Sequence, residues 1–288
     1  MKKIIATILI LINISNSFAQ LPNTDIWLLD IIFVKDSIIL SNPVNITKRV
    51  GYDNQPAFSP DGKYILFTSI HDDKQSDIYK FDLKSKSTSQ FTKTATSEYS
   101  PTFMPDGKNI SVVMVEPDSA QRLWKFPLNG GKPSVILEKF DSIGYHCWFQ
   151  GYRAAVYLLT EPNSLQLISK NYSSPRFVDD SIGRCINYLH SMLCYTKKTV
   201  EGLNQFCFFN LPGWKIEKTT TIIESEDYAF YGGNKVVYGF GNKLYYTYLN
   251  WGKEKELIQD LSVFGIKNIS RITFNPDYSK LAIVAESK

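Results

Sequence analysis

Three histidines are the side chains in this 288-residue chain best suited to metal binding and to proton transfer near neutral pH. His71 lies in a polar loop, His146 comes just before an expected strand, and His190 lies at an expected hairpin turn. A metal site needs several ligands that converge on one point, whereas these three fall at different positions relative to their strands. We therefore expect no metal site, and imidazoles that are either exposed or hydrogen-bonded in the interior.

Four cysteines offer disulfide chemistry: Cys147, Cys185, Cys194 and Cys207. They lack the C-x₂-C spacing of zinc sites. Cys185 and Cys194 belong to one expected hairpin. We expect Phe58 to pair with Tyr64 in the hairpin of the parent repeat, and the same register places Leu193 opposite Cys185. The two sulfur atoms would then lie on opposite faces of the hairpin. A disulfide and buried free thiols both stay open as alternatives.

Motifs of the common enzyme classes are missing from the sequence. It contains no G-x-S-x-G elbow, no H-E-x-x-H, no P-loop and no EF-hand spacing. Gly239-Phe240-Gly241 lies between two strand-like runs and lacks the helix that a dinucleotide-binding fingerprint requires. We expect a turn there, and we predict neither catalytic residues nor a cofactor.

Asp61 is the acidic residue of QPAFSPDGKYILFTS, the stretch from Gln55 to Ser69 on which the chain is built. Pro60 fixes φ at the first turn position, and Gly62 can adopt the positive φ that closes such a turn. A short strand precedes this turn, and a strand rich in Ile, Phe and Thr follows it. The pattern predicts a tight β-hairpin with Asp61 as a turn residue.

Variants of this hairpin recur along the chain, and a period of 40 to 50 residues is typical of propeller blades. Phe58, Phe103 and Trp148 follow one another at spacings of 45 residues. Weaker copies place Ile186, Phe230 and Phe274 at the same position. A second series of strands follows the hairpins, in which Trp27, Tyr79 and Trp124 are equivalent. We expect these large side chains to pack between blades.

The two ends of the repeat array complement each other. Residues 25–31 form a third strand with no hairpin before it, and residues 271–285 form a hairpin with no third strand after it. We infer that the N-terminal strands complete the last blade and leave no exposed sheet edge. The sequence therefore predicts an all-β protein, a single six-bladed β-propeller over residues 20–288.

The first 19 residues have the features of a secretory signal peptide. Lys2 and Lys3 precede an apolar run from Ile4 to Ile14, and Ser17-Phe18-Ala19 fits a cleavage site. We expect a periplasmic or secreted protein without membrane insertion after cleavage, and a monomer. Loss of the two lysines lowers the formal charge from +4 to +2, so we expect no nucleic-acid partner.

The SPDGKYILFTS and MPDGKNISVV hairpins resemble the WD40-like Pro-Asp-Gly repeats of the TolB-like family of six-bladed propellers. The resemblance spans nearly all of the chain after the leader and is weakest between Tyr145 and Tyr246, where the Pro-Asp-Gly turn is missing. It implies an exported propeller that binds a partner. TolB carries an additional N-terminal domain, for which we expect no room in this chain, so the resemblance does not imply the particular role of TolB.

The loops that lead into the innermost strands gather at one mouth of a propeller channel, and their Tyr, Arg and acidic residues suit a protein or peptide partner. The candidate partner-binding residues are Asp53, Asn54, Gln55, Glu98, Tyr99, Tyr145, His146, Arg184, Tyr228 and Arg271.

The leading hypothesis is a non-enzymatic binding propeller that engages a protein or peptide partner in the cell envelope through this channel-mouth face. One alternative is a carbohydrate-active lyase or hydrolase that uses Tyr145, His146, Arg184 and Arg271. A third is a structural accessory subunit of an envelope complex. The sequence names no ligand for any of them.

Overall fold

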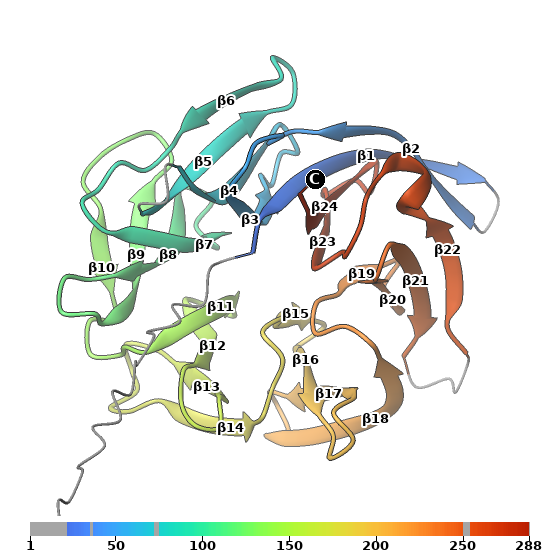
Figure 1. The fold of residues 1–288 in the computed structure, drawn as a ribbon. Coiled ribbons are helices and arrows are strands. Elements are labelled where there is room, and N and C mark those ends of the chain that lie inside the picture. Colours follow the sequence, from blue (N-terminus) through green and yellow to red (C-terminus); the bar gives the residue numbers. More distant parts are fainter. Residues whose placement is uncertain (1–21, 35–36, 72–74, 250–253, 288) are drawn as a thin grey trace, which may run out of the picture.

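A computed structural model describes residues 22–34, 37–71, 75–249 and 254–287. These residues form an all-β propeller, with antiparallel sheets set radially around a central channel (Figure 1). The all-β propeller expected from the repeats is confirmed. The predicted signal peptide, residues 1–19, lies outside the described residues.

Four of the sheets among the described residues have four strands each. The fifth has eight, which a single parallel bridge joins as two groups of four, so we number six four-stranded units in chain order of their innermost strands. From the channel outwards, the first unit consists of β3 (Tyr52–Phe58), β4 (Tyr64–Ile70), β5 (Ser76–Asp82) and β6 (Ser87–Gln90), and the second of β7 (Ser97–Phe103), β8 (Asn109–Val115), β9 (Gln121–Pro127) and β10 (Ser134–Ile136). In the same order, the third unit consists of β11 (Ile143–Phe149), β12 (Arg153–Leu158), β13 (Ser164–Ile168) and β14 (Arg176–Asp180), and the fourth of β15 (Asn187–Leu189), β16 (Met192–Lys198), β17 (Asn204–Asn210) and β18 (Lys215–Ile223). The fifth unit consists of β19 (Ala229–Tyr231), β20 (Lys235–Phe240), β21 (Lys243–Tyr248) and β22 (Glu256–Asp260), and the sixth of β23 (Arg271–Phe274), β24 (Lys280–Glu286), β1 (Thr24–Val34) and β2 (Ser37–Asn45). A 3₁₀-helix, η1 (Leu261–Phe264), follows β22.

The N-terminal strands close the ring as expected. β1 pairs antiparallel with β24, with Ile26 opposite Val284, and β2 forms the outer edge of that unit. A single parallel bridge between Thr24 and Tyr52 joins this unit to the first one. The two ends of the described chain therefore share one sheet, in which each supplies strands that the other lacks.

The Pro-Asp-Gly turn has the predicted structure. Gly62 has φ +68° and donates its N–H to the carbonyl of Ser59 at 2.8 Å. The Asp61 carboxylate accepts the Ser59 hydroxyl at 2.7 Å and the Lys63 N–H at 3.2 Å. The Ser59 hydrogen bond is the main reason that the pKa of Asp61 falls to about 2. Asp61 is therefore a turn residue.

The hairpin register differs from the prediction in two units. Phe58 pairs with Ile65 and not with Tyr64, and Leu193 pairs with Tyr188 and not with Cys185. In the fourth unit the register differs because the turn is shorter. His190 and Ser191 form a two-residue hairpin loop, and both have positive φ, as the common type I′ loop of this length requires. Cys185 therefore precedes β15, and all four cysteines are free thiols.

Apolar side chains pack between neighbouring units. Trp27 contacts a buried cluster that contains Val237 of the fifth unit and Ile283 of the sixth. Trp124 packs on a cluster that joins the first and second units. The predicted role of Trp27, Tyr79 and Trp124 between units is confirmed. Each fully buried large side chain contributes about 1.5–3 kcal/mol to the free energy of unfolding, so the ring is held by its inter-unit contacts.

Candidate ligand-binding channel

The central channel contains two cavities. The larger, of about 590 Å³, is open to solvent and is lined by residues from the innermost strands of all six units. The second, of about 550 Å³, lies where the innermost strands begin and is lined by Tyr52, Asn54 and the segments around Pro22 and Ser287. Tyr145, Arg184 and Arg271 line both cavities, and we call these three residues together with Asp227 the septum.

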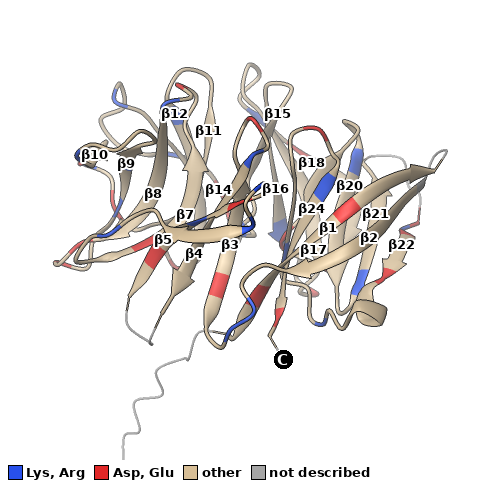
Figure 2. Ribbon diagram, turned by 90° about the horizontal axis from the view of Figure 1, so that it is seen from above, with Lys and Arg blue, Asp and Glu red and all other residues tan. Residues whose placement is uncertain are grey.

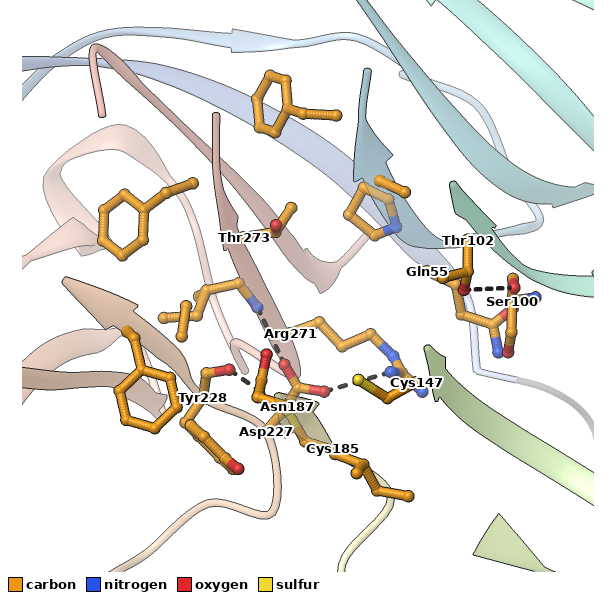
Figure 3. Close-up of a pocket in the computed structure, with 18 of the residues that line it drawn as sticks. Gln55, Ser100, Thr102, Cys147, Cys185, Asn187, Asp227, Tyr228, Arg271 and Thr273 are labelled. Carbon is orange, nitrogen blue, oxygen red and sulfur yellow. Dashed lines mark hydrogen bonds and ion pairs between the residues drawn. The ribbon is translucent and has the colours of Figure 1, made fainter. Parts of the chain in front are cut away.

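Arg271 and Asp227 form the central ion pair of the septum. Arg271 Nη1 lies 3.2 Å from Asp227 Oδ2, and the two side chains point at each other in the channel (Figure 3). Both side chains are largely buried, with exposed fractions of 13% and 7%. Asp227 Oδ1 also accepts the backbone N–H of Ile272 at 3.3 Å, which fixes the carboxylate against β23.

Arg184 and Tyr145 complete the septum. Arg184 Nε lies 3.8 Å from Asp227 Oδ2, and Arg184 Nη2 donates to the carbonyl oxygen of Ser270 at 2.9 Å. Arg271 Nη2 donates to the Tyr145 hydroxyl at 3.0 Å. Two guanidinium groups thus converge on one carboxylate in the wall between the two cavities.

Burial dominates the electrostatics of the septum. It raises the pKa of Asp227, and the neighbouring Arg271 and Arg184 charges oppose that rise. Burial lowers the pKa of Arg271, but the Asp227 carboxylate opposes this strongly enough that the pKa is raised overall. The Nε atoms of both arginines are buried and have no hydrogen-bond partner among the described residues.

His146 is used by the fold. Its Nε2 lies 2.6 Å from the Ser111 hydroxyl, which also accepts the indole N–H of Trp148 at 2.8 Å. Burial lowers the pKa of His146 to about 3, so the ring is neutral at physiological pH. His146 therefore connects the second and third units, while one edge of the residue lines the larger cavity.

Asp53 and Glu98 are buried and lie outside both cavities. Asp53 receives hydrogen bonds from Arg49 at 2.8 Å and from the Ser69 hydroxyl at 2.5 Å, and burial raises its pKa. Glu98 accepts the Thr92 hydroxyl at 2.9 Å, and burial raises its pKa to about 7. Asp53 thus holds Arg49 and Ser69 on β4 together, and Glu98 holds the loop between β6 and β7.

Gln55 joins the first unit to the second at the channel wall. Its Oε1 accepts the Thr68 hydroxyl at 2.7 Å and the Ser100 N–H at 2.8 Å. Gln55 and Ser100 are equivalent in the repeat, and both have positive φ, 57° and 54°, at bulges in β3 and β7. The bulges turn this edge of the strand toward the channel.

The structure brings most of the predicted residues together, but not all of them. Six of the ten line the larger cavity: Gln55, Tyr145, His146, Arg184, Tyr228 and Arg271. Asn54 lines only the second cavity, whereas Asp53, Glu98 and Tyr99 line neither.

Sequence reasoning missed Asp227 and the aromatic residues at the far end of the larger cavity. These are Phe58, Phe103, Tyr188, Phe230, Phe274 and Tyr278, which we call the aromatic rim. The repeat alignment had already selected Phe58, Phe103, Phe230 and Phe274 as equivalent positions. Asp227 directly precedes Tyr228, so the same loop contained the signal for it.

A metal-ligand cluster and a membrane-spanning helix are both absent from the residues that the structure describes. These residues contain no group of three or more His, Cys, Asp or Glu side chains arranged to hold a metal ion. No helix among them has the length and apolar character needed to cross a membrane. Seen from the side, acidic and basic residues are interspersed over the strands and loops in view (Figure 2).

Comparison with known proteins gives structural neighbours. No family model matches the chain, and no curated protein matches it by sequence. A candidate TolB from Agrobacterium tumefaciens is 14% identical, with a TM-score of 0.64 over 92% of this chain and 98% of that one. TolB from Acinetobacter baumannii is 12% identical, with a TM-score of 0.56 over 92% of this chain and 64% of that one. This chain thus spans less than two thirds of the length of the Acinetobacter protein.

Enzymes with propeller domains are also among the neighbours. Oligogalacturonate lyase from Vibrio parahaemolyticus is 13% identical, with a TM-score of 0.54 over 86% of this chain and 83% of that one. At such identities the comparisons show the fold. The chain is a β-propeller with TolB-like structural neighbours.

Proposed function

We propose that this protein is an exported, non-enzymatic binding propeller that engages a protein or peptide partner in the cell envelope through its central channel. The observation that carries this proposal is the convergence of residues from all six units on one open cavity of about 590 Å³. That volume lies within the range of ligand pockets, about 300–1,000 Å³.

The polar groups in the cavity wall support binding more than catalysis. His146 is neutral and hydrogen-bonded to Ser111, and Asp227 is held by Arg271 and by the backbone of Ile272. The septum therefore has the properties of a preorganised recognition surface, whose side chains are fixed before a partner arrives.

Site-specific photo-crosslinking in the source cells tests the proposal. A photoreactive residue at Asn187, which lines the larger cavity, is expected to give a discrete adduct with one envelope protein. The matched control is Lys215, an exposed residue on the outermost strand of the same unit. No adduct at Asn187, or the same adduct at Lys215, would contradict binding through the channel.

Two further measurements test the rest of the proposal. N-terminal sequencing of the protein from the cell envelope is expected to start at Gln20, because the leader should be removed after Ala19. Turnover of polyuronates or other glycans by the purified protein, lost on His146→Ala, would contradict the non-enzymatic assignment and support the alternative of a carbohydrate-active enzyme.

A further inference from the structure

The larger cavity carries excess positive charge. Among the described residues that line it, the charged side chains are Arg184, Asp227 and Arg271. Two arginines face at most one negative charge, so the net charge of the lining is at least +1 whether or not Asp227 is ionised. In a partly buried site such a charge attracts anions more strongly than it would at the protein surface.

The arginines also have unused hydrogen-bond donors. The Nε–H groups of Arg184 and Arg271 are buried and have no partner among the described residues. Burying a hydrogen-bond donor without an acceptor costs free energy, and this cost is larger for a charged guanidinium group than for a neutral group. Arg184 pairs with Asp227 at 3.8 Å and donates to the carbonyl oxygen of Ser270, and its side chain is 31% exposed, so part of it faces open space. An incoming anion would bind at this exposed part of Arg184.

The opposite end of the same cavity is apolar. Phe58, Phe103 and Phe274 are the last residues of β3, β7 and β23, whereas Arg271 is the first residue of β23. The aromatic rim and the septum therefore lie at opposite ends of the innermost strands. A ligand that fills the cavity would meet charged donors at one end and aromatic rings at the other.

We propose that the larger cavity binds a peptide segment that presents a carboxylate to Arg184 and Arg271 and an apolar side chain to the aromatic rim. This inference rests on the proposed function and specifies the chemistry of the partner. The planar guanidinium group matches a carboxylate in geometry and forms short, charge-assisted hydrogen bonds with it. Aromatic rings supply the apolar contact area at the other end.

A peptide fits the lining better than an acidic sugar, which carries the same carboxylate. A sugar needs polar partners for its hydroxyl groups, but Asn275 and Thr102 are already hydrogen-bonded within the protein. Gln55 likewise accepts bonds from Thr68 and Ser100. Ser100 Oγ and the Tyr228 hydroxyl, which line the same cavity, are buried without a hydrogen-bond partner among the described residues. The preference for a peptide therefore rests on the six aromatic side chains of the rim.

Ligand-observed NMR titration of the purified protein tests this proposal with three small probes. N-acetyl-phenylalanine supplies a carboxylate and an apolar ring, N-acetyl-phenylalaninamide lacks the charge, and galacturonic acid supplies the carboxylate on a sugar. We expect the acid to bind about 10- to 100-fold more tightly than the amide, the range that corresponds to one hydrogen bond between charged groups. Galacturonic acid should bind more weakly than N-acetyl-phenylalanine.

Variants at Arg184 connect the binding to the septum. Arg184→Gln leaves the Arg271–Asp227 pair in place and should weaken binding of the acid at least about tenfold, whereas Arg184→Lys should keep part of it. Arg176→Gln is the matched control, because Arg176 is exposed on β14 and lines neither cavity. Urea unfolding of each variant checks that its fold is intact.

The possible outcomes separate this inference from the proposed function. Equal affinity for acid and amide, or no binding of the acid, overturns carboxylate recognition even if Asn187 crosslinks to a partner. Tighter binding of galacturonic acid than of N-acetyl-phenylalanine overturns the peptide assignment. Tight binding of N-acetyl-phenylalanine that is lost in Arg184→Gln supports the carboxylate site at Arg184. This result would support the site even if crosslinking at Asn187 failed and the proposed partner were wrong.

Discussion

Arg271 Nη2 donates a hydrogen bond to the hydroxyl of Tyr145 at 3.0 Å, although the two residues are 126 positions apart in the chain. Arg271 begins β23 of the sixth unit and Tyr145 lies on β11 of the third, so the bond spans the channel (Figure 1). This contact connects the two units through their innermost strands and separates the two cavities.

Tyr145→Phe should remove the cross-channel hydrogen bond and keep the ring. We expect the free energy of unfolding to fall by about 0.5–1.5 kcal/mol, the usual contribution of one such bond. Urea denaturation measures this, with Tyr172→Phe as the control because Tyr172 lines neither cavity. Equal stability of both variants would show that the contact does not hold the units together.

The Arg271–Asp227 pair should behave as one energetic unit. Arg271→Gln leaves the buried Asp227 carboxylate with the more distant Arg184 and the N–H of Ile272, and we expect a loss of about 3 kcal/mol in the free energy of unfolding. The double variant Arg271→Gln with Asp227→Asn removes both charges and should lose less than the sum of the two single variants. Additive losses in a double-mutant cycle by urea unfolding would argue against direct coupling.

Glu98 should make stability depend on pH. Burial raises its pKa in the folded protein to about 7, with a further contribution from the neighbouring Asp77, whereas the ordinary value applies when the chain is unfolded. The contribution of the protonated group is complete below about pH 4.5 and is lost as the pH rises through about 7. The contribution of Glu98 to the free energy of unfolding therefore decreases as the pH rises from about 4.5 to about 7.

Glu98→Gln should remove that dependence. The variant is expected to be more stable than the parent by about 1–3 kcal/mol above pH 7, and the difference should shrink toward pH 4. Unfolding by urea across this pH range measures the effect, and Glu138→Gln at an exposed position is the control. A parent protein that gains stability as the pH rises through 7, relative to Glu98→Gln, would contradict the assignment.

Deletion of residues 20–47 should prevent formation of a stable monomer. The deletion removes β1 and β2, leaves the edge of β24 unpaired, and takes Ile26 and Leu29 out of two inter-unit clusters. An unpaired apolar edge also favours association between chains. Thermal unfolding and size-exclusion chromatography test this, and a truncated monomer that melts as cooperatively as the intact chain would contradict closure by these strands.

Local sequence determined much of this fold. The 45-residue spacing of Phe58, Phe103 and Trp148 indicates repeated units, because each hairpin is specified by residues close together in the chain. Pro60, Asp61 and Gly62 specify their turn through their own backbone preferences. The complementary chain ends predicted the pairing of β1 with β24, since an unpaired strand and an incomplete sheet require each other.

The residues of the candidate site could be predicted from the sequence only in part. The loops before the innermost strands were the correct place to look for Tyr145, Arg184, Tyr228 and Arg271. The same rule also selected Asp53 and Glu98, which are buried between strands. Position in the repeat identifies a loop, but the direction of a side chain depends on bulges such as those at Gln55 and Ser100.

The sequence by itself thus determined the repeating hairpins, the order of the strands and the closure of the ring, because these follow from backbone preferences and neighbouring residues. Only the tertiary structure decided that Asp227 pairs with Arg271 and that Arg271 reaches Tyr145. Those partners lie 44 and 126 residues apart. They meet because six units close into a ring, and the side chains that line its axis come together only when closure is complete.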